Sequence, residues 1–410
     1  MNEKAVAVAL WQDGGSIKEH ISLKELTALA KTAEVEIIED FIQHRDRPDR
    51  RYYLGPGKVN EIGIYLEENQ VSTVIFDCEL SPSQVNNLEK KLSAKVIDRS
   101  ELILDIFARR ANTKEGKLQV ELAQLQYQLP KLVGQRRDLS RLAGGIGTRG
   151  PGETKLETDR RHIRHRINVL KREIKALEKH RSLIRQRRQR AGVFQVALVG
   201  YTNSGKSTLL NSITAADTYA ADALFATLDP LSRRLETDQG PLVISDTVGF
   251  ISGLPHHLIA AFKATLEVAV HADLLVHVVD VAEPEAHLRL AEVNAVLTQL
   301  ECQDKDQIIA ANKIDLVDNL GELASLFREA PPHIPISAST GKNIPALKEA
   351  IIARMNPRIF LRARLPLEIY RKISRSQPGQ ITPIEFSREH VIIEARLPRE
   401  LAESLSVYEI

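Results

Sequence analysis

The segment GYTNSGKST at residues 200–208 constrains the fold more than any other part of the chain, because it fits the pattern G-x-x-x-x-G-K-[S/T]. An apolar run, FQVALV, precedes it and a helical pattern, STLLNSI, overlaps its end. This is the strand–loop–helix setting that a phosphate-binding loop requires. The glycines allow successive backbone N–H groups to face phosphates at a helix N-terminus. The segment therefore predicts a nucleotide-binding α/β unit.

Within this loop each polar residue has an expected task. Lys206 should neutralise oxygens of the β- and γ-phosphates, and the Ser207 hydroxyl should ligate Mg²⁺. The loop residues that we expect to contact the nucleotide are Gly200, Tyr201, Thr202, Asn203, Ser204, Gly205, Lys206, Ser207 and Thr208.

The segment DTVGF at 246–250 follows the next apolar run and fits Asp-x-x-Gly. We expect Asp246 to reach Mg²⁺ through its water shell and the Gly249 amide to donate to the γ-phosphate, with Thr247 and Val248 between them. Many GTPases then have a glutamine that orients the attacking water. Here the residue is Phe250, which cannot hold water by hydrogen bonding, so the catalytic group is unknown.

The segment NKID at 312–315 indicates which base is bound. Asp315 can accept two hydrogen bonds from the N1–H and N2–H₂ edge of guanine, where adenine has no matching donors. A site built on such bonds rejects the wrong base by roughly 10⁴–10⁵. We expect Asn312 to tether the loops, the Lys313 stem to cover the base, and Ile314 to complete the segment. In ISAST (336–340), backbone near Ala338 should donate to guanine O6, flanked by Ser337 and Ser339.

Residues 212–241 are polar and are expected to form loops, including the stretch FATLDP at 225–230. A threonine is needed to close over Mg²⁺ when the γ-phosphate is present. We favour Thr227, with Thr218 as the alternative. The expected contacts here are Phe225, Ala226, Thr227, Leu228 and Asp229. Triphosphate should order this stretch and DTVGF, and hydrolysis should release them.

The remaining α/β patterns divide the chain. Apolar runs at 5–11, 35–42, 72–77 and 94–98 alternate with helical patterns, which predicts an N-terminal α/β domain over 1–110 with a largely parallel sheet. Ser22 and Ser81 are plausible helix caps. Residues 192–356 alternate in the same way and predict a doubly wound GTPase domain. Two strand-like segments, 359–369 and 390–398, and a short helix predict a small C-terminal α+β domain over 357–410.

Residues 111–191 have a different, heptad-like period. It predicts two helices that form an antiparallel hairpin. The alternative is one helix packed on a neighbouring domain and one free. The leucine and isoleucine positions are Leu118, Leu122, Leu125, Leu129, Leu132, Ile163, Ile167, Leu170, Ile174, Leu177 and Ile184.

The second of these helices is strongly basic, although the whole chain has a net charge of only +2. Residues 155–190 contain fourteen basic side chains against four acidic ones. Such a stripe is typical of a surface that binds a phosphate backbone; a charged coiled-coil exterior usually balances both signs. The glycine-rich turn GGIGTRGPGETK permits close approach to RNA, or is only a flexible connector. The expected RNA contacts are Arg136, Arg137, Arg141, Arg149, Lys155, Arg185, Arg187 and Arg188.

Other features limit the class of protein. The two cysteines, Cys78 and Cys302, are far apart and have no metal-ligand spacing, which fits a reducing cytosol. Charges interrupt the most apolar region, 258–282, so a buried helix and a strand explain it better than a membrane span. The N-terminus has no signal-peptide pattern. We expect a cytoplasmic protein with no membrane span.

The nucleotide motifs, in this order and spacing, resemble the translation-factor-like GTPases of the Obg–HflX superfamily. Three further segments narrow the resemblance to the HflX family: LGPGKVNEI (54–62), the stretch 105–132 and GGIGTRGPGETKLETDRR (144–161). The likeness runs over nearly the whole chain, and only the last fifty residues match loosely. The family also has an apolar residue after Asp-x-x-Gly, so Phe250 conforms to it.

The resemblance implies a GTPase that uses Mg²⁺, binds the large ribosomal subunit and its RNA, and separates stalled or idle ribosomes into subunits. It places the tip of the hairpin toward the catalytic centre of that subunit. We expect a monomer, no DNA partner, and slow hydrolysis that the ribosome stimulates. Two alternatives stay open: a ribosome-assembly checkpoint GTPase, and a signalling GTPase whose hairpin binds protein.

Overall fold

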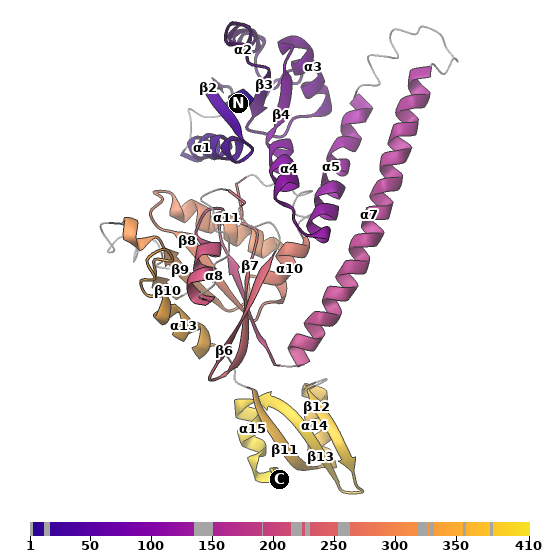
Figure 1. The fold of residues 1–410 in the computed structure, drawn as a ribbon, viewed down its shortest axis with the longest axis vertical. Helices are drawn as coiled ribbons and strands as arrows, with labels where there is room; N and C mark the ends of the chain where they lie inside the picture. Colours follow the sequence, from indigo (N-terminus) through magenta and orange to yellow (C-terminus); the bar gives the residue numbers. More distant parts are fainter. Residues whose placement is uncertain are drawn as a thin grey trace.

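The computed structural model describes residues 3–11, 17–134, 151–190, 192–214, 224–225, 230–252, 263–317, 327, 332–355, 358–377 and 380–410. Figure 1 shows an N-terminal α/β unit, a central nucleotide-binding unit and a small C-terminal unit along the long axis, with two long helices at one side. The predicted fold class, α/β with mainly parallel sheets, is confirmed.

The N-terminal unit is a four-stranded parallel sheet in the order β2-β1-β3-β4. Its side chains alternate between two faces, as the pleat of a strand requires. Val6 and Val8 face a core with α2 and α3, whereas Ala5 and Ala7 face a second core with α1 and α4. The elements are β1 (Glu3–Trp11), α1 (Ile17–Thr32), β2 (Val35–His44), α2 (Pro56–Asn69), β3 (Thr73–Phe76), α3 (Pro82–Leu92), β4 (Lys95–Asp98) and α4 (Arg99–Arg110).

Of the two predicted helix caps in this unit, one is confirmed and one is wrong. Ser81 caps α3 in a capping box with Gln84. Ser22 instead lies inside α1, which begins at Ile17. Its hydroxyl and its carbonyl accept hydrogen bonds from Arg99. A tertiary contact therefore uses the side chain that local sequence assigned to a cap.

The nucleotide-binding unit contains a six-stranded sheet in the order β10-β9-β8-β5-β7-β6. All neighbours are parallel except β6 and β7. Strand β6 lies in the stretch that we expected to be loop; its residues alternate between half-buried and exposed, as on a sheet edge. The elements are β5 (Phe194–Val199), α8 (Lys206–Thr214), β6 (Leu231–Thr237), β7 (Gly240–Asp246), α10 (Lys263–His271), β8 (Leu274–Asp280), α11 (Ala286–Gln299), β9 (Gln307–Asn312), η1 (Ile314–Leu316), β10 (His333–Pro335) and α13 (Ile344–Ala353).

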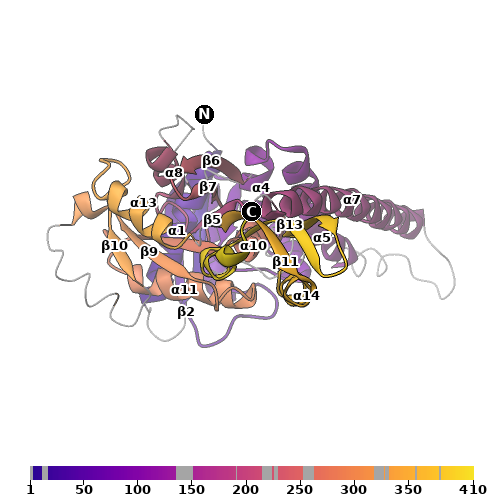
Figure 2. The same cartoon turned by 90° about the horizontal axis from the view of Figure 1, so that it is seen from below.

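The two long helices, α5 (Lys114–Gly134) and α7 (Pro151–Arg190), form the structure that we call the arm. They are antiparallel: Glu121 pairs with Arg166, and Glu115, earlier in α5, pairs with Arg181, later in α7. Ile167 and Leu170 of the heptad pattern are buried. Helix α5 also packs on α3 and α4, with Lys131 paired to Glu101 of α4 at 2.7 Å. Figure 2 shows the arm extending away from the sheets.

The C-terminal unit has a three-stranded antiparallel sheet in the order β11-β13-β12. Strand β12 was not predicted, because Pro383 interrupts its pattern; proline is tolerated there because the strand lies at a sheet edge. The elements are β11 (Arg358–Pro366), α14 (Leu367–Ser376), β12 (Ile381–Phe386), β13 (His390–Pro398), α15 (Arg399–Leu405) and η3 (Ser406–Tyr408). Among the residues that the structure describes, no helix is both long and apolar enough to cross a bilayer.

Candidate functional site

The phosphate loop connects β5 to α8 at the carboxyl end of the central sheet. Gly205 adopts a left-handed φ of 94°, and a Cβ there would stand 2.2 Å from Asn312 Nδ2, so only glycine fits. Lys206 is buried and donates to the carbonyl oxygens of Gly200 (3.1 Å) and Tyr201 (2.6 Å). Burial lowers the pKa of Lys206 to about 8. A bound polyphosphate would restore the charge that burial disfavours.

The magnesium ligands predicted from sequence lie together in part. Ser207 Oγ donates to Asp246 Oδ2 at 2.6 Å, and Asp246 is fully buried at the end of β7. A hydroxyl and a carboxylate are the oxygen donors that Mg²⁺ prefers. The pair therefore fits a magnesium ion that also contacts nucleotide phosphates, as P-loop GTPases generally use. Thr227 lies outside the described residues.

The segment after Asp246 lies directly on the phosphate loop. Thr202 N donates to Phe250 O at 2.7 Å, and Phe250 N donates to Gly200 O at 3.1 Å. A Cβ on Gly249 would stand 2.7 Å from Thr202 Cα, so this close approach requires glycine. The Phe250 ring is buried in the core beside Tyr201 and Ile251. The ring therefore packs the segment and offers no polar group to a water molecule.

The predicted base-binding loops are joined by one side chain. Asn312 Nδ2 donates to Ser204 O at 2.8 Å, and Asn312 Oδ1 accepts from Ala338 N at 2.9 Å. The Ala338 amide, expected to face guanine O6, is therefore used by Asn312 in this structure. Lys313 forms an ion pair with Asp280 at 2.7 Å. Asp315 is exposed, and the Ser337 hydroxyl is the main cause that lowers the pKa of its carboxyl group.

The N-terminal unit contacts the phosphate loop through a buried hydrogen-bond network that no sequence motif predicted. Tyr201 donates its hydroxyl to Glu25 of α1 at 2.7 Å and accepts from the Ser252 amide at 2.7 Å. The Ser252 hydroxyl also donates to Glu25. A residue of the phosphate loop and a residue just after Phe250 are thus held by the same carboxylate.

Arg99, at the start of α4, completes this network. Its guanidinium lies 2.5 Å from both Glu25 and Asp77, and it donates to Ser252 O at 3.1 Å. Arg99 and Glu25 are both less than a tenth exposed. We call Glu25, Asp77, Arg99, Tyr201 and Ser252 the buried junction. Sequence reasoning missed Glu25, Arg99 and Ser252, because each lies in an ordinary helix or loop segment. The contacts of Glu25 with Arg99 and with Ser252 span 74 and 227 residues.

The N-terminal unit also contacts the segment FATLDP. The rings of Phe225 and Phe107 (on α4) meet edge to face with centroids 4.6 Å apart. Phe225 is buried, so its side chain packs into the core. The phosphate loop, Phe225 and the segment after Phe250 therefore all touch the N-terminal unit.

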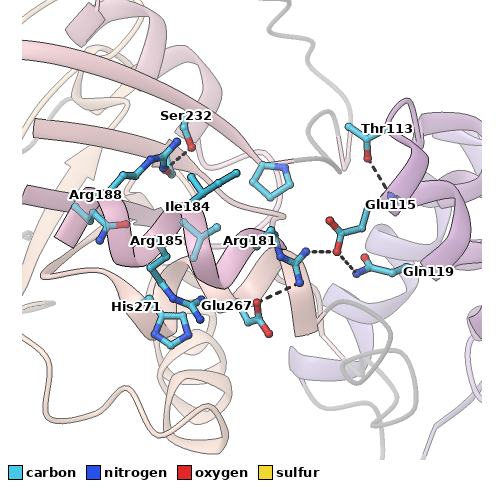
Figure 3. A pocket seen from close by; sticks show the side chains of 15 residues that line it. Thr113, Glu115, Gln119, Arg181, Ile184, Arg185, Arg188, Ser232, Glu267 and His271 are labelled. Atoms are coloured by element: carbon cyan, nitrogen blue, oxygen red, sulfur yellow. Dashed lines mark hydrogen bonds and ion pairs between the residues drawn. The ribbon is translucent and has the colours of Figure 1, made fainter. Parts of the chain in front are cut away.

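The arm contacts the nucleotide-binding unit through three charged residues, Glu115, Arg181 and Glu267, which we call the arm base. Figure 3 shows Arg181 of α7 between Glu115 of α5 and Glu267 of α10. They border a cavity of about 350 Å³, also lined by Arg185 and Arg188. Burial, together with the charges of Arg185 and Lys305, lowers the pKa of the neighbouring His271.

The expected RNA contacts have different places in the structure. Arg187 is exposed, whereas Arg185 and Arg188 are half-buried at the cavity. Helix α7 includes Lys155, whose side chain is not described. The remaining predicted site residues lie outside the described part of the chain: Arg136, Arg137, Arg141, Arg149, Thr218, Ala226, Thr227, Leu228 and Asp229.

Comparison with known proteins gives three family matches along the chain. Residues 20–108 match the GTP-binding GTPase N-terminal family, and residues 110–188 match the middle region of the same GTPases. Residues 195–313 match the 50S ribosome-binding GTPase family. A solved structure, SsGBP in complex with GDP, is 25% identical with a TM-score of 0.48 and covers 85% of this chain and 98% of its own.

Curated relatives match over almost the full length. The GTPase HflX of Caldanaerobacter subterraneus is 44% identical over 407 residues, which cover 98% of this chain and 93% of the relative. The GTPase HflX of Escherichia coli is 43% identical over 403 residues, which cover 97% and 94%. The chain therefore belongs to the HflX family of GTPases, and it hydrolyses GTP.

Proposed function

We propose that this GTPase binds the large ribosomal subunit through the arm and, in its GTP state, splits stalled or idle ribosomes into subunits. The observation that carries the proposal is the row of exposed basic side chains along α7. It includes Arg161, Arg164, Lys171, Arg172, Lys175 and Lys179. A set of cations of this size along one helix follows a phosphate backbone better than it follows a protein surface. A cytoplasmic location, where ribosomes are found, is part of the proposal.

The arm base supports a link between nucleotide and arm. Helix α10 follows the DTVGF segment in the chain, and its Glu267 pairs with Arg181 of α7 at 3.2 Å. A change in the DTVGF segment on GTP binding would therefore reach the RNA-binding helix. We assign Mg²⁺ to Ser207 and Thr227, with Asp246 acting through water, and guanine selection to Asp315.

Hydrolysis by the isolated protein should be slow, because the buried Phe250 cannot orient water. Related GTPases that have the glutamine turn over at only about 10⁻⁴ s⁻¹, and partners raise this about 10⁵-fold. We propose that the large subunit stimulates turnover. The measurement is GTP turnover with and without saturating large subunits, and equal rates would contradict the proposal.

Sedimentation of intact ribosomes tests the splitting activity. Protein with a non-hydrolysable GTP analogue should convert them to free subunits, whereas a ribosome-assembly checkpoint GTPase would leave them intact. Reversing three exposed arm cations, Arg164→Glu, Lys171→Glu and Lys175→Glu, should abolish splitting and flatten the salt dependence of binding. A control with the same charge change away from the arm, Lys31→Glu, Lys91→Glu and Arg388→Glu, should keep both. Unchanged ribosome affinity in the arm variant would favour the protein-binding alternative.

A further inference from the structure

A second cavity lies where the N-terminal unit meets the phosphate loop. Its volume is about 560 Å³. Helix α1 contributes Lys24 and Ala28 to its wall, and the phosphate loop contributes Thr202 and Asn203. These loop residues stand between the two glycines that wrap the phosphates, so the cavity opens beside the triphosphate site. No nucleotide motif contributes Lys24 or Ala28.

The cavity contains three side chains that can carry positive charge, and two have other partners. Arg289 pairs with Glu283 at 3.4 Å and lies 5.0 Å over the Tyr201 ring. The His20 ring stacks edge to face on Trp11, with centroids 4.2 Å apart. Lys24 is exposed and has no acidic partner within ion-pair distance among the described residues. Four carboxylates also line the cavity, and three of them are paired with cations: Glu25 with Arg99, Asp280 with Lys313 and Glu283 with Arg289. The Lys24 ammonium is therefore the cation available to a ligand.

The helix that carries Lys24 is held in place by the buried junction. Glu25, the next residue, is bonded to Tyr201 of the phosphate loop at 2.7 Å and to Arg99 at 2.5 Å. Helix α1 is thus fixed relative to the phosphates before nucleotide binds. A cation held in advance near developing charge is worth more than one that must be recruited.

We infer that Lys24 is a catalytic cation supplied in cis to the γ-phosphate of GTP. The motifs provide Lys206 and the ligands expected for Mg²⁺, and the Phe250 side chain offers no polar group for the reaction. Other GTPases add an arginine from the same chain or from a partner at this stage, which raises kcat by about 10³–10⁵. Here a lysine of the N-terminal unit has the role that this arginine has in other GTPases.

The chemical step needs no proton from Lys24. A water oxygen bonds to the γ-phosphorus, the bond from phosphorus to the β–γ bridging oxygen breaks, and its electron pair stays on GDP. Negative charge develops on the transferring oxygens, and the positive charge of Lys24 offsets it. The inference rests on GTP hydrolysis alone and is independent of ribosome splitting.

The test uses the full chain with two readouts: single-turnover GTP hydrolysis, and the affinity of GDP with aluminium fluoride, which imitates the transition state. Lys24→Ala should lower the hydrolysis rate by about 100- to 1,000-fold, a loss typical of one removed transition-state contact. The affinity for GDP with fluoride should fall by a similar factor, while the affinity for GDP alone is unchanged. Lys24→Arg should retain most of the rate.

Lys31→Ala is the matched control, because Lys31 is exposed on the same helix and does not line the cavity. Its rates and affinities should equal those of the unchanged protein. The inference is overturned if Lys24→Ala behaves like Lys31→Ala in both readouts. It is also overturned if Lys24→Ala weakens GDP with and without fluoride equally, since that would mean ordinary nucleotide binding.

Discussion

Among the described residues, two of the contacts between the nucleotide-binding unit and its neighbours differ in their exposure to water. At the buried junction, the side chains of Arg99 and Glu25 are each 6% exposed. At the arm base, Arg181 is 29% exposed and its partner Glu115 is 21% exposed. Both places are networks of one arginine between two carboxylates, so burial is the main physical difference between them.

This difference determines what each contact does. A charge removed from water must keep its partners, because an unpaired buried charge is very unfavourable. The N-terminal unit and the phosphate loop should therefore move as one body. Half-exposed charges at the arm base can exchange their partners for water at little cost. The arm base is thus the contact that can loosen when the nucleotide changes.

The largest expected effect comes from removing the centre of the buried junction. Arg99→Met keeps apolar volume but leaves Glu25 and Asp77 buried without their cation, which should cost about 3–5 kcal/mol of unfolding free energy. Urea unfolding of the full chain, followed at the transition that includes the N-terminal unit, measures it.

Arg109→Met is the control for this experiment. Arg109 pairs with Glu34 at 2.8 Å in the same unit, but both are more than half exposed. Exposed pairs typically contribute about 0–1 kcal/mol. Equal losses for the two variants would show that burial is not what distinguishes the contacts.

The next effect concerns the hydroxyl that links the phosphate loop to this junction. Tyr201→Phe keeps the ring but leaves Glu25 and the Ser252 amide each short of a hydrogen bond, which should cost about 1–3 kcal/mol. Hydrogen exchange of the Ser252 amide should become faster, because Tyr201 is its acceptor. Tyr370→Phe, in the C-terminal unit, should change neither quantity. Unaltered exchange at Ser252 would mean that the hydroxyl does not hold this segment.

These two variants also show what the sequence could not predict. The motifs located Lys206, Asp246 and Asn312, because short patterns specify a strand, a turn and a helix start within a few residues. The four-stranded parallel sheet was predictable from period and alternation. The buried junction depends on pairs such as Glu25 and Ser252, which are 227 residues apart. No local pattern encodes such a distance.

Two strands were missed for local reasons. Strand β6 is rich in charge, since edge strands keep polar side chains toward water, and we expected a loop there. Strand β12 contains Pro383, which usually argues against a central strand. Heptad spacing predicted the helices of the arm, but it did not show that α5 also packs on the N-terminal unit. The Phe225 side chain, which we expected near the nucleotide, packs on Phe107, a contact with another unit that no local pattern indicated.

A third prediction concerns a buried histidine under the phosphate loop. His277 of β8 is 1% exposed, and burial, with a contribution from Lys206, lowers its pKa to about 3. The unfolded chain binds a proton near pH 6.5, so between about pH 6.5 and pH 3 the unfolded state holds more protons than the native state. As the pH is lowered through this window, the free energy of unfolding should therefore decrease by up to about 1.4 kcal/mol for each pH unit.

Thermal unfolding at pH 7, 6 and 5 checks this prediction. His277→Gln should make the dependence of stability on pH shallower by the contribution of one proton, because glutamine does not titrate. His333→Gln serves as the control, since His333 is exposed and its loss should leave the slope nearly unchanged. Parallel slopes for the parent and His277→Gln would mean that the imidazole is not kept neutral by burial.

The smallest expected effect is at the arm base. Arg181→Ala removes a partly exposed cation from Glu115 and Glu267, and after allowance for screening it should cost at most about 1 kcal/mol. The loss should shrink in 1 M salt, where the Debye length is about 3 Å, whereas the loss for Arg99→Met should persist. Burial already raises the pKa of Glu115, and Arg181 opposes that shift, so its removal should raise this pKa further. Urea unfolding at low and high salt gives the first result, and carboxyl titration by NMR gives the second. If Arg181→Ala costs as much as Arg99→Met at both salt concentrations, the arm base is held as firmly as the buried junction, and its loosening with the nucleotide is excluded.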